Sequence, residues 1–306
     1  MTTMTKQKAA AKPRSAPPRS GYTRVLLNTP YLLWCVIFVL VPLAMVAYYA
    51  FTDGSGHFTL GTFADLLATA EKRATLVDVF GRSMFYALIA TAISLVLAYP
   101  LAYIMAHSGR GAQRNLMMLL MVPMWMNFLI CTYCWMNILS KNGIINGGIA
   151  WVNLKLSPLG LALPKLDMLN KPGAVILGMV YNYLPYMILP IYTVLAKLSP
   201  SLVEAAQDLG ASRFQVLRKV TAPLSLPGVA SGITMVFVPS VSTFYISQKL
   251  GGTKNQLIGD WIERSFMGGY SYNGGAALSL ILMLIIVVCM MVMKHFSDGE
   301  EGAFVA

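Results

Sequence analysis

The chain has 306 residues, of which 57% are hydrophobic and only 11% are charged, and its mean hydropathy is +0.63. Because about 25% of the residues of an average soluble domain are charged, this composition excludes a soluble globular protein and predicts an integral membrane protein. The net charge of +11 would also suit nucleic-acid binding. However, the basic residues lie in loops and tails beside hydrophobic runs, where they set membrane orientation, so no nucleic acid is expected as a partner.

Six stretches contain no Asp, Glu, Lys or Arg, and each can supply the roughly 20 apolar residues with which a helix crosses about 30 Å of hydrocarbon. They do not alternate polar and apolar residues as barrel strands do. We therefore expect an all-α membrane protein with six transmembrane helices over residues 25–296, between a disordered basic tail (1–24) and a short tail (297–306). The stretches are 25–52, 83–106, 115–140, 172–196, 221–248 and 265–293.

The basic N-terminal tail indicates orientation. Residues 1–24 contain six basic residues and no acidic one, which favours a cytoplasmic N terminus, and six spans then return the C terminus to the cytoplasm. The loop 141–171 fits this orientation least well, because it carries four Lys and one Asp on the outside. Its apolar portion, 144–156, is expected to lie on the membrane surface.

The loops and prolines predict some local structure. Loop 53–81 is expected to hold a short surface helix. The turn 107–114 is so short that the second and third spans must be antiparallel neighbours, the third being one helix over about 116–138. Prolines recur inside five spans, where they either permit bending or simply pack: Pro42, Pro100, Pro123, Pro185, Pro190 and Pro239.

A polar, patterned segment, 198–222, separates the fourth and fifth spans. Ser201 with Glu204, and Ser212 with Gln215, have the spacing of capping boxes, while Gly210 between them suits a helix C terminus. The pattern predicts two short amphipathic helices around a glycine break, with Pro223 restarting the chain as the fifth span. Such a segment at a membrane surface suits a soluble protein partner.

The sequence lacks an energy source of its own. None of the spans has an ionisable residue in its interior, which disfavours a proton-driven carrier, and there is no phosphate-binding loop for ATP. His57, His107 and His295 are scattered, so no metal site or catalytic group is expected. Active transport would therefore need ATP and Mg²⁺ bound by another subunit.

The segment resembles the conserved motif of binding-protein-dependent ABC importer permeases: E-A-A, three residues, G, nine residues, I-x-L-P. The matching residues here are Glu204-Ala205-Ala206, Gly210, Val220 and Pro223. Val220 replaces the Ile and Ala222 the Leu of the motif, both apolar changes. The runs 178–190 and 239–244, with 250–252, are more narrowly similar to spermidine/putrescine permeases.

This resemblance implies one added helix and a five-helix core, two ATPase subunits, a sister permease and an extracytoplasmic substrate-binding protein. It implies a multi-pass protein of the bacterial inner membrane that is itself no enzyme and binds no cofactor. The residues that couple to the ATPase would be Glu204, Ala205, Ala206, Gly210, Arg213 and Pro223.

A path that carries a polycation through the membrane needs aromatic ring faces or carboxylates to replace the water that hydrates the cation. Such side chains are candidates here, although each aromatic could instead be an interfacial anchor and each acid a solvated surface group. The candidates are Trp135, Tyr181, Tyr183, Tyr186 and Phe244, with Asp260 and Glu263 near the outer mouth.

Two alternatives remain open. The same machine could carry an amino-acid derivative, an opine or an iron complex, or the chain could be a membrane scaffold that binds a soluble protein without transport. A secondary carrier is disfavoured, because an ionisable relay and an internal repeat are both missing from the sequence.

Overall fold

The computed structural model describes residues 29–156, 163–268 and 271–304, with side chains up to Met293. The described residues are mostly helical, with one isolated bridge between Thr52 and Phe58. The chain divides after Tyr48 into two compact units, each of which is described by itself. The basic tail expected at 1–24 lies outside the described residues.

The first unit holds the greater part of one apolar helix, Thr29–Ala50. A π-helical turn, η1 (Val36–Leu40), leads into α2 (Val41–Ala50), and the Val41 N–H reaches back to the Val36 carbonyl. Such a widened turn accommodates Pro42, which has no N–H and whose ring needs room beside the preceding turn. The helix consists almost entirely of apolar residues and is long enough to cross the hydrocarbon of a membrane.

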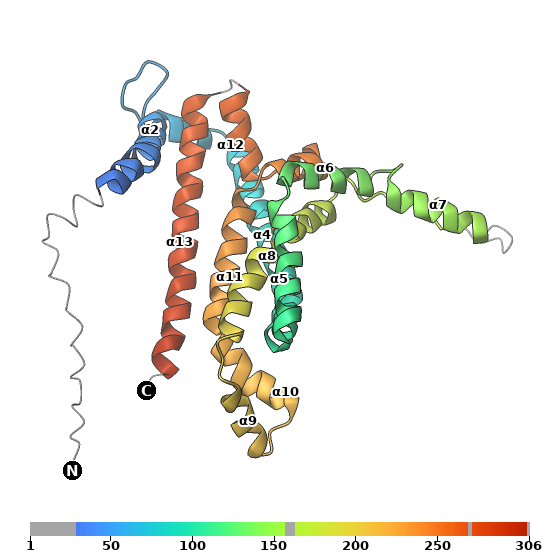
Figure 1. Ribbon diagram of the computed structural model, residues 1–306. Helices are drawn as coiled ribbons and strands as arrows, with labels where there is room; N and C mark the ends of the chain where they lie inside the picture. Colours follow the sequence, from blue (N-terminus) through green and yellow to red (C-terminus); the bar gives the residue numbers. More distant parts are fainter. Residues whose placement is uncertain (1–28, 157–162, 269–270, 305–306) are drawn as a thin grey trace, which may run out of the picture. The chain divides into compact units, whose positions relative to one another are not determined.

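The second unit contains the remaining elements (Figure 1). Among the described residues of the whole chain, five helices are long and apolar enough to cross a membrane, or six if a bent pair counts as one span. The elements are α3 (Gly61–Leu67), α4 (Ala70–His107), α5 (Arg110–Trp125), α6 (Phe128–Leu139), α7 (Ile144–Leu156), α8 (Pro172–Leu195), α9 (Pro200–Asp208), α10 (Arg213–Val216), η3 (Leu217–Thr221), α11 (Ala222–Ser242), η4 (Ser247–Gly251), η5 (Thr253–Asn255), α12 (Ile258–Met267) and α13 (Tyr272–Phe304). The surface helix expected in loop 53–81 is α3, and α13 continues into the predicted tail.

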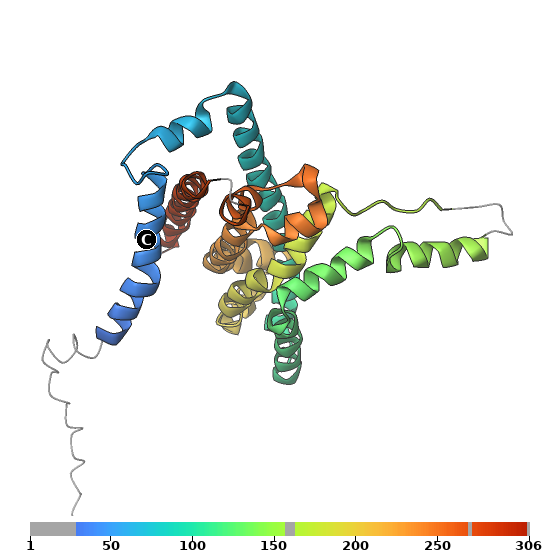
Figure 2. The same cartoon turned by 90° about the horizontal axis from the view of Figure 1, so that it is seen from above.

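Helices α4, α8 and α11 form the centre of this unit (Figures 1 and 2). Small residues let their backbones approach closely, as is common between membrane helices. A Cβ on Gly228 would lie 2.9 Å from the Pro190 carbonyl oxygen, and Gly232 lies against Met187. On α4 the buried small residues recur at helical spacing: Ser83, Ala87, Ala90, Ser94, Ala98 and Ala102.

The third span is bent, which corrects the prediction of one helix over 116–138. The chain turns by 89° between 110–125 and 128–156. The break lies at Met126 and Asn127, which are both extended, and the Asn127 side chain accepts a hydrogen bond from the Leu129 N–H at 2.9 Å. Asn127 thus caps a new helix, α6, where the hydrophobicity pattern alone indicates continuation.

The loop after this bend forms an arm made of α7 and residues 163–171. Asn146 and Asn153 are seven residues apart on one face of α7, and each side-chain amide pairs with both backbone groups of one residue. Asn146 donates to and accepts from Leu166 at 2.8 Å, and Asn153 does the same with Leu163 at 2.8 and 2.7 Å. The outer face of α7 exposes Ile144, Trp151 and Leu154. That α7 lies on the membrane surface remains a prediction.

Candidate functional site

The first helix of the patterned segment, α9, ends in a Schellman motif. Gly210 has φ +85°, the left-handed conformation that favours glycine. The Gly210 N–H donates to the Gln207 carbonyl at 2.8 Å, and the Ala211 N–H donates to the Ala206 carbonyl at 3.1 Å. These two bonds satisfy carbonyls that a helix end would otherwise leave unpaired. The glycine break thus has the geometry that the sequence predicts.

The start of α9 differs from the prediction. The helix begins at Pro200, with Ser199 as its N-cap, so Ser201 and Glu204 lie inside it and form no capping box. Proline suits the first helical position because the N–H that it lacks would be unpaired there anyway. Glu204 is exposed, and its side chain makes no hydrogen bond or ion pair with the described residues. Its carboxylate therefore does not cap α9 and is available to a partner.

The second capping box is confirmed. Ser212 accepts from the Gln215 N–H at 3.3 Å, and the Gln215 side chain accepts from the Ser212 N–H at 2.8 Å. Arg213 is the first residue of the helix so capped and is exposed.

The predicted restart at Pro223 is wrong, because α10 continues into the fifth span without a break. The π-helical turn η3 joins α10 to α11, and the Ala222 N–H donates to the Leu217 carbonyl. This wider turn makes room for Pro223, as η1 does for Pro42. Residues 213–242 are therefore one apolar helix, and its polar end belongs to the patterned segment.

Exposed apolar side chains surround the glycine break. Leu209 is 90% exposed and Phe214 69%, and Leu202 is also exposed. Exposed beside them are Ala205, Arg218 and Lys219, while Ala206 and Pro223 are half-buried. Figure 1 shows α9 and α10 at one end of the helical bundle, with α12 at the other. We call the residues 198–222 the coupling segment.

The structure does not bring all the candidate path residues together. Tyr183 and Tyr186 line a small pocket of about 230 Å³ with Asn182, next to the break between α5 and α6. Phe244 and Glu263 line a different pocket of about 380 Å³, and Glu263 accepts from Gln248 at 3.0 Å. Phe244 lies beyond the end of α11 at Ser242, so the fifth span ends sooner than the predicted 248.

The remaining candidates are packed against other residues. Trp135 and Tyr181 meet edge to face, with ring centroids 5.4 Å apart, beside a buried cluster. Asp260 is completely buried, and one of its carboxylate oxygens accepts from the Leu257 N–H at 2.7 Å. Burial raises the pKa of Asp260 to about 6, although the hydrogen bond from Leu257 opposes the shift. Asp260 therefore caps the start of α12.

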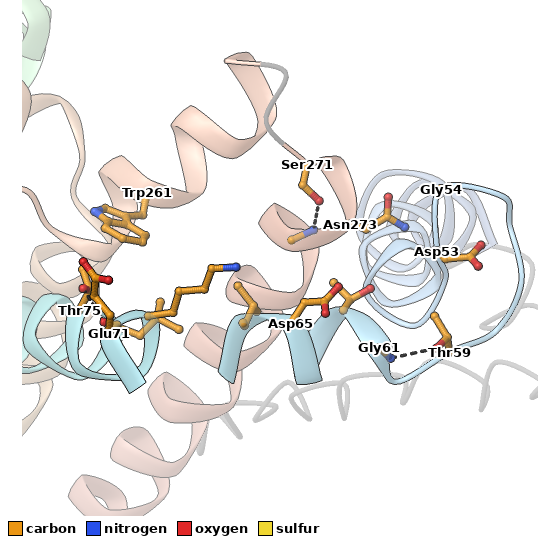
Figure 3. A pocket seen from close by; sticks show the side chains of 15 residues that line it. Asp53, Gly54, Thr59, Gly61, Asp65, Glu71, Thr75, Trp261, Ser271 and Asn273 are labelled. Atoms are coloured by element: carbon orange, nitrogen blue, oxygen red, sulfur yellow. Dashed lines mark hydrogen bonds between the residues drawn. The ribbon is translucent and has the colours of Figure 1, made fainter. Parts of the chain in front are cut away.

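The largest pocket that we describe, about 950 Å³, was not anticipated from the sequence. It lies beside α3 and the start of α4, and Figure 3 shows the side chains that line it. Trp261, Asn273 and the carboxylates of Asp53, Asp65 and Glu71 line it. Hydrogen bonds from the His57 and Ser55 N–H groups lower the pKa of Asp53. The only sequence signal for this pocket is the net acidic loop 53–81.

The described side chains include no group of three or more His, Cys, Asp or Glu residues arranged to hold a metal ion. Cys131 is buried and Cys134 is exposed, and both are free thiols. The strongest candidate for function is therefore the coupling segment, which presents an interaction surface and no reactive group.

The comparisons with known proteins identify the family of the chain. Residues 98–299 match the family of binding-protein-dependent transport system inner membrane components. The chain is 34% identical to the spermidine/putrescine transport system permease protein PotB of Escherichia coli over 85% of this chain and 92% of that protein. It is 29% identical to the inner membrane ABC transporter permease protein YdcU of the same organism, over 92% and 90% of the two chains.

A solved structure supports the fold. A bacterial ABC transporter involved in the import of the acidic polysaccharide alginate has a chain that superposes with a TM-score of 0.66, at 17% identity over 90% of this chain and 98% of that chain. Such a likeness shows the fold alone. The family match covers more than half of the sequence, and with the PotB relatives, which are 34% identical, it establishes that this chain belongs to the binding-protein-dependent ABC importer permeases of the inner membrane.

Proposed function

We propose that the chain is a permease subunit that forms half of a polyamine translocation path, driven by ATP hydrolysis on two separate ATPase subunits. The observation that carries this proposal is the coupling segment. It exposes Leu209 and Phe214 on either side of a glycine turn that hydrogen bonds hold in one conformation. Exposed apolar side chains that gather in one patch, as Leu202, Leu209 and Phe214 do around this turn, mark a protein interface more often than single ones do.

The partner at this surface would be the ATPase. Glu204 is exposed and uses none of its hydrogen-bonding capacity within the described residues, so a basic side chain of the ATPase can pair with it. Ala205 and Ala206 are small enough to let the partner approach the helix closely. Arg213 offers a further charge for an acidic group of the ATPase.

The connection to the membrane would transmit the motion. Since α10, η3 and α11 are one continuous helix, a force on Arg213 or Phe214 acts directly on the fifth span. Closure of the ATPase pair on ATP would tilt this helix and alternate access to the path. A helix transmits such a displacement better than a flexible linker, because its hydrogen-bonded turns move as a unit.

The cargo and the other subunits of the complex are proposed from the relatives. Polyamine is favoured because the PotB proteins, 34% identical, are named for spermidine and putrescine. A sister permease would supply the other half of the path, because this chain has one coupling segment and two ATPases need two. An extracytoplasmic binding protein would deliver the cargo, both termini would be cytoplasmic, and ATP and Mg²⁺ would be bound only by the ATPases.

Glu204→Lys and Phe214→Ser in the assembled complex test the docking proposal. We expect both to abolish spermidine-stimulated ATP hydrolysis and uptake of radiolabelled spermidine, while the chain still inserts in the membrane. Arg73→Glu is the control, since Arg73 is an exposed charged residue near the start of α4 and lies outside the coupling segment. Normal stimulated hydrolysis in both variants would rule out docking through this segment.

The cargo is tested separately with the wild-type complex. Unlabelled putrescine and spermidine should compete with radiolabelled spermidine for uptake. If neither competes, the polyamine assignment is wrong, even where the coupling variants behave as expected. Uptake of an amino-acid derivative, an opine or an iron complex would then identify the cargo. Absence of a cognate ATPase, sister permease and binding protein would instead favour the scaffold alternative.

A further inference from the structure

A lysine lies against two tyrosine rings near the end of the fifth span. The Lys249 ammonium nitrogen is 5.2 Å from the centroid of the Tyr133 ring and 5.6 Å from that of Tyr245. The two rings are 6.0 Å apart and nearly perpendicular, at 78°. Both distances to the nitrogen are within about 6 Å, where the negative face of an aromatic ring attracts a cation.

The backbone explains why these groups meet. Tyr245 and Lys249 are four residues apart on one helical turn that continues into η4, so their side chains lie on the same face. Tyr133 comes from α6, which reaches this place only because the third span bends by 89°. A straight third span would carry Tyr133 elsewhere.

The tyrosine pair is next to the pocket that holds two of the candidate path residues. Phe128 lines that pocket together with Tyr183 and Tyr186. The same Phe128 ring packs edge to face on Tyr245, with centroids 5.6 Å apart. Aromatic side chains thus run without interruption from the pocket to Lys249.

We propose that Tyr133 and Tyr245 form a binding site for an alkylammonium group of the cargo, and that Lys249 fills this site until a cargo ammonium displaces it. The lysine side chain is itself a primary alkylammonium ion, the same chemical group that ends a linear polyamine. A site that binds the lysine ammonium can therefore bind a polyamine ammonium through the same cation–π attraction. This inference rests on the proposed polyamine cargo, for which it names specific residues.

Access to the site supports displacement. Tyr133 is 42% exposed, and Phe128 is also exposed, so the described residues of this chain leave the rings partly uncovered. Lys249 forms no ion pair with the described residues, so only the two tyrosine side chains, through their rings and the Tyr133 hydroxyl, need to release it. A second ammonium of the same molecule could then lie in the pocket beside Tyr183 and Tyr186, since the pocket shares Phe128 with the tyrosine pair.

A purely structural role makes the opposite prediction. If Lys249 only fastens η4 to α6, its removal would loosen the packing and leave the apparent affinity for cargo unchanged or weaker. If it competes with cargo, its removal would strengthen that affinity. The direction of the change in KM therefore separates the two roles.

The test uses the assembled complex in proteoliposomes and initial rates of radiolabelled spermidine uptake. We expect Lys249→Met to lower KM between about 2-fold and about 30-fold, the range that cation–π attraction implies. Lys249→Arg should keep the wild-type KM, while Tyr133→Leu and Tyr245→Leu should raise it. Lys155→Met is the matched control, because Lys155 lies over Trp151 on α7 at 5.8 Å, away from the pocket.

An unchanged or raised KM in Lys249→Met would overturn the inference, provided that the variant melts at the wild-type temperature. If the wild-type complex takes up no spermidine, the proposed cargo fails, but the site can still be tested with tetramethylammonium. Saturation-transfer NMR should then detect stronger binding to Lys249→Met than to wild type, and none to Tyr133→Leu. Equal binding to all three would contradict the site independently of the cargo.

Discussion

The backbone N–H of Ala211 donates to the carbonyl of Ala206 across the glycine turn, at 3.1 Å. This bond closes the end of α9 and directs the chain into the capped start of α10. Ala205 and Ala206 are therefore held at a fixed position relative to the helix that becomes the fifth span. The small residues of the family motif thus belong to the hydrogen-bonded turn that joins α9 to α10.

Replacement of Gly210 should weaken coupling through the backbone alone. A Cβ at Gly210 would meet nothing within 4 Å, but φ is +85° there. The left-handed conformation costs a β-branched residue about 1–2 kcal/mol or more, and costs Asn less. Gly210→Val should therefore lower uptake and stimulated ATP hydrolysis more than Gly210→Asn does. Gly111→Ala is the control, since it is open, exposed and at ordinary φ. Equal activity of the Val and Asn variants would contradict this account.

The hydrophobicity pattern predicted the helical class and most of the spans, because apolar length is a local property of the sequence. It did not predict the bend at Asn127, since one capping side chain redirects a span without changing its composition. Nor did it predict that α10 continues through η3 into α11, past Pro223, because a π-helical turn accommodates the proline. Both errors come from hydrogen bonds of single residues that hydropathy does not register.

The candidate site was predictable to a similar degree. The turn at Gly210 and the Ser212 capping box follow from residue spacing alone and are confirmed. The candidate path residues were predicted because they are aromatic or acidic. The chemical nature of a residue does not reveal which side chains line the same pocket. Tyr133 and Lys249 escaped notice because they become neighbours only through the bend of the third span.

Two glycines, one packed against α8 and one in open space on α4, predict opposite effects of substitution by alanine. At Gly228 a Cβ would lie 2.9 Å from both the Pro190 oxygen and the Val194 side chain, so Gly228→Ala should destabilise the fold by about 1–3 kcal/mol. At Gly81 on α4 nothing lies within 4 Å, so Gly81→Ala should stabilise it by about 0.5–1 kcal/mol. Thermal unfolding of the detergent-purified chain measures both. A Gly228→Ala variant as stable as wild type would show that the helices are not in contact here.

The arm predicts a local effect on hydrogen exchange. Asn146 is buried and bonds both the N–H and the carbonyl of the exposed Leu166, so Asn146→Ala should lose these two bonds at a net cost of about 0.5–1.5 kcal/mol each. The amide of Leu166 should then exchange with deuterium faster, on the order of 10-fold or more, while the amides of α8 are unaffected. Asn142→Ala, at an exposed position before α7, is the control. Unchanged exchange at Leu166 would contradict the pairing.

The buried carboxyl of Asp260 predicts how stability depends on pH. Its pKa is raised to about 6 by burial, whereas an unfolded Asp has a pKa of about 3.9. Between these values the folded chain holds a proton that the unfolded chain has released, so stability falls as the pH rises from about 4 to 6. The loss from this group amounts to about 3 kcal/mol above pH 6.

Asp260→Asn stands in for the protonated carboxyl and keeps an oxygen that can accept from the Leu257 N–H. The variant should therefore melt at a higher temperature than wild type at pH 7, and the difference should shrink toward pH 4. Asp65→Asn, at an exposed position in α3, should follow the wild-type profile throughout. A constant difference between Asp260→Asn and wild type across this range would mean that the carboxyl is ionised in the folded protein, and that its charge is stabilised despite burial.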